Sequence, residues 1–162
     1  MSRLDSVIRR LKAQRACLNA AAERVAGREG VVLELGLGNG RTYDHLREIL
    51  PERQIFVFER EVRAHPDCIP PDDYLYLGDV RDTLTRAAAD LAGRAVLVHS
   101  DIGTGEAARN AALAAEISRL LPGLLAPGAV IVSDQALALP GTRPLDPPEG
   151  VRPGRYHMAV KG

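Results

Sequence analysis

The chain has 162 residues, enough for one domain with a single core, and its 46% hydrophobic and 26% charged residues are typical of a globular protein in water. Its formal net charge is +0 and only 4% of its residues are aromatic, so no basic stretch or stacking surface favours a nucleic-acid partner. No apolar run approaches the ~20 residues that span a bilayer, and charged residues interrupt the N-terminal segment, so we expect no membrane partner, no signal peptide and a cytoplasmic location.

Apolar residues recur at helical spacing over residues 3–26, which predicts an amphipathic helix within an N-terminal segment of residues 1–28. Beyond it, apolar strands alternate with amphipathic helices. Strands are predicted at residues 31–35, 54–59, 74–77, 95–99, 129–133 and 156–160, and further helices at residues 40–50, 79–91 and 106–121. Residues 137–154, rich in Pro and Gly, are predicted to form a long loop. This order predicts an α/β fold with one mostly parallel central sheet, helices on both faces and a single domain over residues 1–162.

The most informative segment is the end of the first strand. An acid, Glu34, is followed by the alternate glycines Gly36, Gly38 and Gly40 and then by a helix. Such a turn lets the backbone adopt positive φ and lets a nucleotide-type ligand approach closely. A carboxylate there would repel a pyrophosphate, and Arg41 stands where a dinucleotide-binding turn has its last glycine. The segment therefore favours a nucleoside ligand with a positive charge over NAD.

The run from Glu34 to Gly40 resembles the first motif, E/D-x-G-x-G-x-G, of the class I (Rossmann-like) methyltransferases that use S-adenosyl-L-methionine (SAM), and it matches every fixed position. The continuation to Arg47 is similar to that of short, stand-alone bacterial members. The resemblance implies the Rossmann-like methyltransferase fold, SAM as the cofactor and methyl transfer as the activity. The residues of this region expected to bind the cofactor are Glu34, Gly36, Leu37, Gly38, Asn39, Gly40, Thr42 and Tyr43.

Acids also follow the second and third strands. Glu59 lies about 19 residues beyond Gly40, where an acid accepts both ribose hydroxyls, and Arg60 could flank the adenine. After the third strand comes Gly78-Asp79-Val80, and the resemblance implies that Asp79 accepts from the adenine amino group while the amide of Val80 meets the ring. Asp79 is also a suitable helix N-cap.

The fourth strand ends in His99-Ser100-Asp101, which should lie near the methyl group and the amino-acid end of SAM. We therefore expect His99 and Ser100 to contact the cofactor. His99 and Asp101 are the candidate catalytic residues, because either could take a proton from an acceptor. A structural histidine is an equally good interpretation of His99.

Three alternative functions remain beside methyl transfer to a small molecule without a metal. Asp101, Asp134 and Gln135 resemble the magnesium ligands of catechol-type O-methyltransferases, but Gln135 replaces an Asn and no Lys follows Asp101, so we assign no metal site. A non-catalytic SAM- or nucleotide-binding module is a second alternative, and an NAD-dependent oxidoreductase, disfavoured by Glu34 and Arg41, is a third. We expect a small-molecule acceptor, covered by residues 137–154, whereas association into a homo-oligomer is left open by the sequence.

Overall fold

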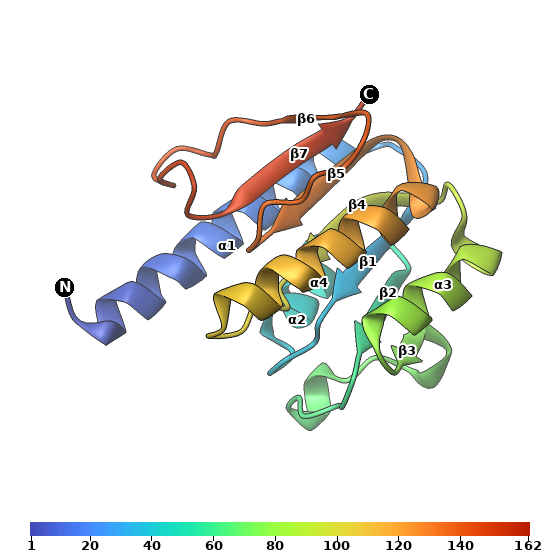
Figure 1. Ribbon diagram of the computed structural model, residues 1–162, viewed down its shortest axis with the longest axis horizontal. Coiled ribbons are helices and arrows are strands. Elements are labelled where there is room, and N and C mark those ends of the chain that lie inside the picture. The colour runs from blue at the N-terminus through green and yellow to red at the C-terminus, as the bar shows by residue number, and fades with distance from the viewer.

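The computed structural model describes residues 1–162 and is built around one seven-stranded sheet with the strand order β3-β2-β1-β4-β5-β7-β6 (Figure 1). The strands are β1 (Val31–Leu35), β2 (Ile55–Glu59), β3 (Leu75–Leu77), β4 (Ala95–Ser100), β5 (Leu125–Ser133), β6 (Thr142–Pro144) and β7 (His157–Lys161). The first five strands are parallel, and β7 runs antiparallel to both of its neighbours, β5 and β6. The predicted mostly parallel sheet is confirmed.

Helices cover both faces of the sheet, as predicted. The helices are α1 (Arg3–Val25), α2 (Arg41–Ile49), α3 (Val80–Leu91) and α4 (Ala107–Leu120), with short 3₁₀ turns η1 (Pro66–Cys68), η2 (Asp72–Tyr74) and η3 (Leu121–Leu124). Helix α1 packs on β4, β5 and α2, whereas α3 and α4 pack together on the other face (Figure 1). None of these helices has the length and apolar character that crossing a membrane requires.

Two apolar layers result from the alternation of side chains along the strands. Val32 belongs to the layer under α1 and α2, and its neighbour Leu33 to the layer under α3 and α4. Every residue of β1 is buried, as expected of a parallel strand covered on both faces. The chain runs from β1 outward to β3 and returns to β4, so β1 and β4 flank the point where the strand order reverses. Ligands bind at the carboxyl ends of the strands at such a point.

Most element ends agree with the prediction within one residue, and two segments differ by more. Strand β5 begins at Leu125 rather than at residue 129, because a register shift between Ala95 and Leu97 extends its pairing with β4. The stretch 137–154 is not a plain loop, since β6 lies within it and pairs with β7. Pro144 is tolerated in β6 because this strand lies at the edge of the sheet, where one side needs no ladder hydrogen bonds.

Candidate functional site

The glycine-rich turn between β1 and α2 has the backbone that its sequence predicts. Gly36, Gly38 and Gly40 have φ values of 89°, 52° and 84°. A Cβ on Gly36 would lie 2.5 Å from Cγ2 of Ile102 and 2.8 Å from the carbonyl oxygen of Asp101. The turn therefore passes directly against the segment that follows β4, and no side chain fits at Gly36. Gly40 is the N-cap of α2 and offers no side-chain acceptor, so the first amides of this helix lack a capping side chain.

Glu59 lies beside this turn. One of its carboxylate oxygens accepts from the backbone N–H groups of Leu37 and Gly38 at 2.8 and 3.0 Å, and the other accepts from the N–H of Arg60 at 2.7 Å. The acid at the end of β2 is thus held against the turn, which is the position expected of a group that accepts ribose hydroxyls. The side chain of Arg60 is exposed to solvent.

A cavity of about 160 Å³ follows the turn. The turn, the start of α2, the segment after β4 and α1 all contribute to its walls, and the lining residues are Gly36, Leu37, Gly38, Asn39, Arg41, Thr42, Asp101, Arg10, Leu11 and Gln14. The structure therefore brings together most of the predicted turn residues and Asp101. It adds three residues of α1 that the sequence interpretation missed. Gln14 could have been recognised from the sequence, because it is a polar residue within the apolar stripe between Leu11 and Leu18.

A buried chain of polar side chains lies next to this cavity. Nδ1 of His99 is 2.5 Å from Oε1 of Glu34, and Nε2 of His99 is 2.6 Å from the hydroxyl of Tyr156. Gln14 donates through Nε2 to that hydroxyl at 3.1 Å and to Oδ2 of Asp101 at 2.7 Å. The side chains of Glu34 and His99 are 0% exposed. Sequence-distant residues of α1, β1, β4 and the segment before β7 thus form one hydrogen-bonded chain.

Burial changes the proton affinities along this chain. It raises the pKa of Glu34, against the opposing charge and hydrogen bond of His99. Burial alone would lower the pKa of His99, but the charge and hydrogen bond of Glu34 outweigh it and raise the pKa. Burial also raises the pKa of Tyr156 far above its usual value, so this hydroxyl keeps its proton.

The burial of His99 does not fit its predicted contact with a methyl acceptor, because the side chain is inaccessible and both ring nitrogens already have partners. Ser100 is buried as well, with 1% exposure, and Tyr43 is a core residue with 4% exposure. Neither side chain lines the cavity beside the turn. Of the two predicted catalytic residues, only Asp101 faces this cavity.

Glu34 lies within the strand just before the turn, and its Oε2 is buried without any hydrogen-bond partner. An incompletely paired buried carboxylate favours a cationic neighbour. His99 already stands beside Glu34 as that neighbour, and the Glu34 side chain is 0% exposed and does not line the cavity beside the turn, so its predicted contact with the cofactor is not direct. The glycine turn and the acid at the end of β2 are the groups that suit a nucleoside ligand such as SAM.

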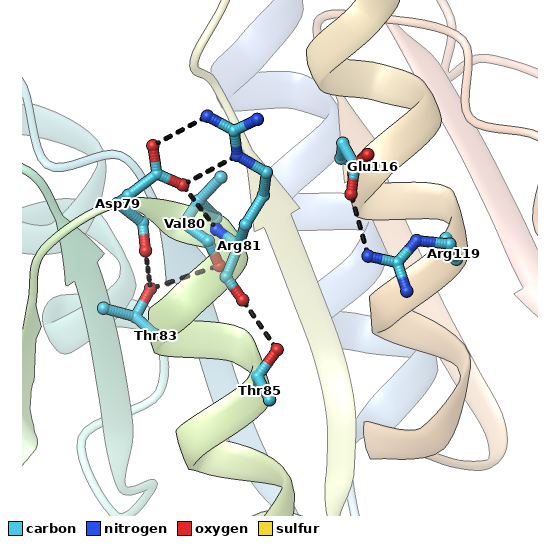
Figure 2. Close-up of polar contacts among 7 residues, drawn as sticks. All are labelled: Asp79, Val80, Arg81, Thr83, Thr85, Glu116 and Arg119. Carbon is cyan, nitrogen blue, oxygen red and sulfur yellow. Dashed lines mark hydrogen bonds and ion pairs between the residues drawn. The ribbon is translucent and has the colours of Figure 1, made fainter.

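Asp79 occupies the end of the third strand as predicted, and it is the N-cap of α3 (Figure 2). Its carboxylate accepts from the backbone N–H of Arg81 at 2.9 Å and from the guanidinium of that residue at 3.0 and 3.2 Å. The hydrogen bonds from Arg81 lower the pKa of Asp79. The N–H of Gly78 donates to the carbonyl of Glu59 and so ties the ends of β3 and β2 together, while Val80 begins α3. The capping role of Asp79 is confirmed, and the adenine contact stays a prediction.

The residues of the metal alternative are arranged differently from a ligand set. Asp101 contacts Gln14 and lies 3.9 Å from a nitrogen of Arg10. Oδ2 of Asp134 accepts from the N–H of Gly103 at 3.0 Å, whereas Oδ1 is buried without a partner. Burial and the charge of Asp101 raise the pKa of Asp134. No three His, Cys, Asp or Glu side chains are grouped so that they could hold a metal ion.

A larger cavity, of about 740 Å³, lies under the stretch 137–154. Its walls come from the end of β5, from that stretch and from the start of β7. Tyr156 lines this cavity, and its hydroxyl belongs to the buried chain that reaches Asp101. A hydrogen bond between Tyr156, which lines the larger cavity, and Gln14, which lines the smaller one, therefore links the walls of the two cavities.

Comparisons with known proteins agree with this geometry. A profile of the S-adenosyl-L-methionine methyltransferase family matches residues 1–160. The crystal structure of an S-adenosyl-L-methionine methyl transferase from Silicibacter pomeroyi DSS-3 is 44% identical, with a TM-score of 0.95 over 100% of this chain and 99% of that one. A comparison with curated protein sequences found no match.

More distant structures share the fold. Human methyltransferase-like protein 13, solved with SAH, is 14% identical, with a TM-score of 0.54 over 91% of this chain and 78% of that one. The rRNA methyltransferase aviRa from Streptomyces viridochromogenes is 16% identical, with a TM-score of 0.56 over 90% and 81%. With a family profile that spans nearly the whole sequence and a relative at 44% identity, the chain belongs to the S-adenosyl-L-methionine methyltransferase family and is a SAM-dependent enzyme of the class I, Rossmann-like fold.

Proposed function

We propose that this enzyme transfers the methyl group of SAM to a small molecule that binds in the 740 Å³ cavity under residues 137–154. The observation that supports this most strongly is the chemistry of that cavity. Its volume falls within the ~300–1,000 Å³ of pockets that enclose drug-sized ligands. Apolar side chains such as Leu139 and Met158 alternate with polar ones such as Gln135 and His157, and no Lys or Arg lines it. A nucleic-acid acceptor would need cations for its phosphates.

The cofactor would lie along the glycine turn. Gly38, where a Cβ would meet nothing within 4 Å, would let it approach the backbone. Glu59 would accept from the ribose hydroxyls, and Asp79 and Val80 would meet the adenine. When bound, SAM supplies an electrophilic methyl group with its leaving group already attached. The protein then has mainly to align the acceptor with that methyl group, and such positioning can contribute ~7–11 kcal/mol.

The two predicted catalytic residues take other roles in this proposal. The His99 side chain is buried and cannot reach an acceptor. Its role in this proposal is to orient Tyr156 through a hydrogen bond. Asp101 is already engaged by Gln14 and Arg10, so it is better placed to hold a charged group than to take a proton. An acceptor that is already nucleophilic when it binds fits this site best.

A metal-dependent O-methyltransferase is the second candidate, and one observation favours it. Oδ1 of Asp134 is buried without a hydrogen-bond partner, and the charge of Asp101 helps to raise the pKa of Asp134. Two carboxylates that bind one cation would interact in the same way. Activity that survives EDTA supports the metal-independent mechanism. Activity that chelation abolishes and magnesium restores supports the second candidate.

The acceptor class is tested with SAM labelled in its methyl group and a bacterial extract separated into low-molecular-mass metabolites and RNA. We expect label in the metabolite fraction with the wild-type enzyme and, at a SAM concentration below its dissociation constant, much less with the Glu59→Ala variant, which would lack the ribose contact. Label found only in RNA would contradict the small-molecule proposal. Binding of SAM without any transfer would instead support a non-catalytic module.

A further inference from the structure

The cavity beside the glycine turn is lined by residues of α1 that belong to no strand-end motif. Gln14 is a polar side chain with only 4% exposure, and both N–H groups of its amide are used, one toward Asp101 and one toward Tyr156. Because Tyr156 is itself bonded to the buried His99, this amide has little freedom to turn. Gln14 therefore fixes the Asp101 carboxylate at the wall of the cavity.

Arg10 lies one helical turn before Gln14 on the same face of α1. Its guanidinium is 3.9 Å from the carboxylate of Asp101, and the two side chains stay 45% and 28% exposed. At that separation the pair is a loose, partly solvated ion pair, whose members gain little from each other. Both can therefore exchange their mutual contact for contacts with a ligand.

We propose that Arg10 and Asp101 bind the amino-acid end of SAM, with the carboxylate of the ligand at Arg10, its ammonium at Asp101, and Gln14 as the residue that positions Asp101. The proposal rests on the location of the cofactor along the glycine turn. An amino acid carries its ammonium and carboxylate on one carbon, and this wall presents an anion and a cation side by side. The planar fork of an arginine also matches a carboxylate well.

The dimensions agree with this assignment. The cavity, at about 160 Å³, is smaller than pockets that enclose whole drug-sized ligands, so it suits one end of the cofactor. Arg41 is the other cation in its wall and is the competing partner for the ligand carboxylate. If Arg10 and Asp101 act as proposed, α1 is what distinguishes SAM and S-adenosylhomocysteine from nucleosides that lack an amino-acid end.

The test compares two ligands that differ at that end. S-adenosylhomocysteine and 5′-methylthioadenosine are both uncharged at sulfur, and only the first carries the amino acid. In calorimetric titrations, Arg10→Gln should weaken S-adenosylhomocysteine about tenfold, the loss expected for one charge-assisted contact, and leave 5′-methylthioadenosine unchanged. Asp101→Asn and Gln14→Leu should show the same selective loss. Arg9→Gln, a neighbouring exposed arginine outside the cavity, is the matched control and should change neither affinity.

The alternative outcomes separate this assignment from the proposed function. An equal loss for both ligands, or no loss, in Arg10→Gln overturns the role of Arg10, and this exposed position keeps the test valid if Gln14→Leu fails to fold. A selective loss in Arg41→Gln but not in Arg10→Gln also overturns it. Wild-type protein that binds neither ligand contradicts the location of the cofactor, and the inference fails with it.

Discussion

Glu59 is the acid whose surroundings are most informative at the scale of single residues. Its carboxylate already accepts from two amides of the glycine turn, so the same side chain that would meet the ribose also shapes the turn. The carboxylate can reorganise because it is only partly buried. Glu59 therefore ties the end of β2 to the turn. The two ribose hydroxyls of a bound nucleoside could take the place of the backbone N–H groups that its carboxylate now accepts from.

Glu59→Ala should weaken SAM binding at least tenfold, because each lost charge-assisted hydrogen bond to a ribose hydroxyl contributes about 1.5–3 kcal/mol. The affinity is measured by calorimetry on folded protein. Glu61→Gln is the control, since Glu61 is an exposed acid paired only with Arg63. Equal SAM affinities in the Glu59 variant and the wild type would remove the ribose assignment.

Asp134 gives a prediction for the dependence of stability on pH. Its pKa is raised in the folded protein, so the folded state holds a proton that the unfolded state has released, and stability falls as pH rises from about 4 to the raised pKa. Asp134→Asn removes this titration and should flatten the profile, which chemical unfolding between about pH 4 and 8 measures. Glu34 and His99, whose pKa values are also raised, should still make the stability of the Asp134→Asn variant fall with rising pH. Parallel profiles for variant and wild type would show that Asp134 titrates alike in both states.

At the scale of elements, two glycines of the turn between β1 and α2 allow effects on stability to be distinguished from effects on SAM binding. Gly36→Ala should destabilise the protein by about 1–3 kcal/mol, because its methyl group would meet Ile102 and the backbone of Asp101 at positive φ. A Cβ on Gly38 meets nothing within 4 Å, so Gly38→Ala should be milder for stability while its methyl group enters the cavity beside the turn. Thermal unfolding of the free proteins, followed by SAM titration, tests both. Equal destabilisation by the two substitutions would contradict this distinction.

The stretch 137–154 gives the second prediction for an element. Because β6 pairs with β7, only the segment after it can be shortened without breaking the sheet. Replacing residues 146–150 with a brief Gly/Ser link should leave SAM affinity nearly intact and lower turnover of the acceptor, since Asp146 and Pro147 line the larger cavity. Turnover is measured once an acceptor is identified. Unchanged turnover would make this stretch a connector only.

The limits of prediction from sequence are also set at this level. The strand, turn and helix around Gly36 follow from neighbouring residues, and they were predicted correctly. β6 was missed because a three-residue strand with a proline depends on pairing with β7. Gln14 was missed as a site residue for a similar reason, since its partners Asp101 and Tyr156 are 87 and 142 residues away in the sequence. The polar break that Gln14 makes in an apolar stripe was the signal available.

At the scale of the whole molecule, the site depends on the closure of the fold. The carboxyl ends of β1 and β4 meet where the strand order reverses, and the two ends of the chain complete the site from α1 and from the segment before β7. Helix α1, the first element of the chain, packs on β5 (Figure 1), and its Gln14 bonds to Tyr156, just before the last element, β7. Such long-range contacts exist only in the complete fold.

The most direct test of the account is a thermal-unfolding titration of the wild-type protein with SAM and, separately, with NAD. A ligand that binds only the folded state stabilises it by about 2.7 kcal/mol at 100 times its dissociation constant. We predict a saturable rise in the unfolding temperature with SAM and no rise with NAD, because Glu34 and Arg41 make the turn unsuitable for a pyrophosphate. A saturable response to NAD without any response to SAM would contradict the account.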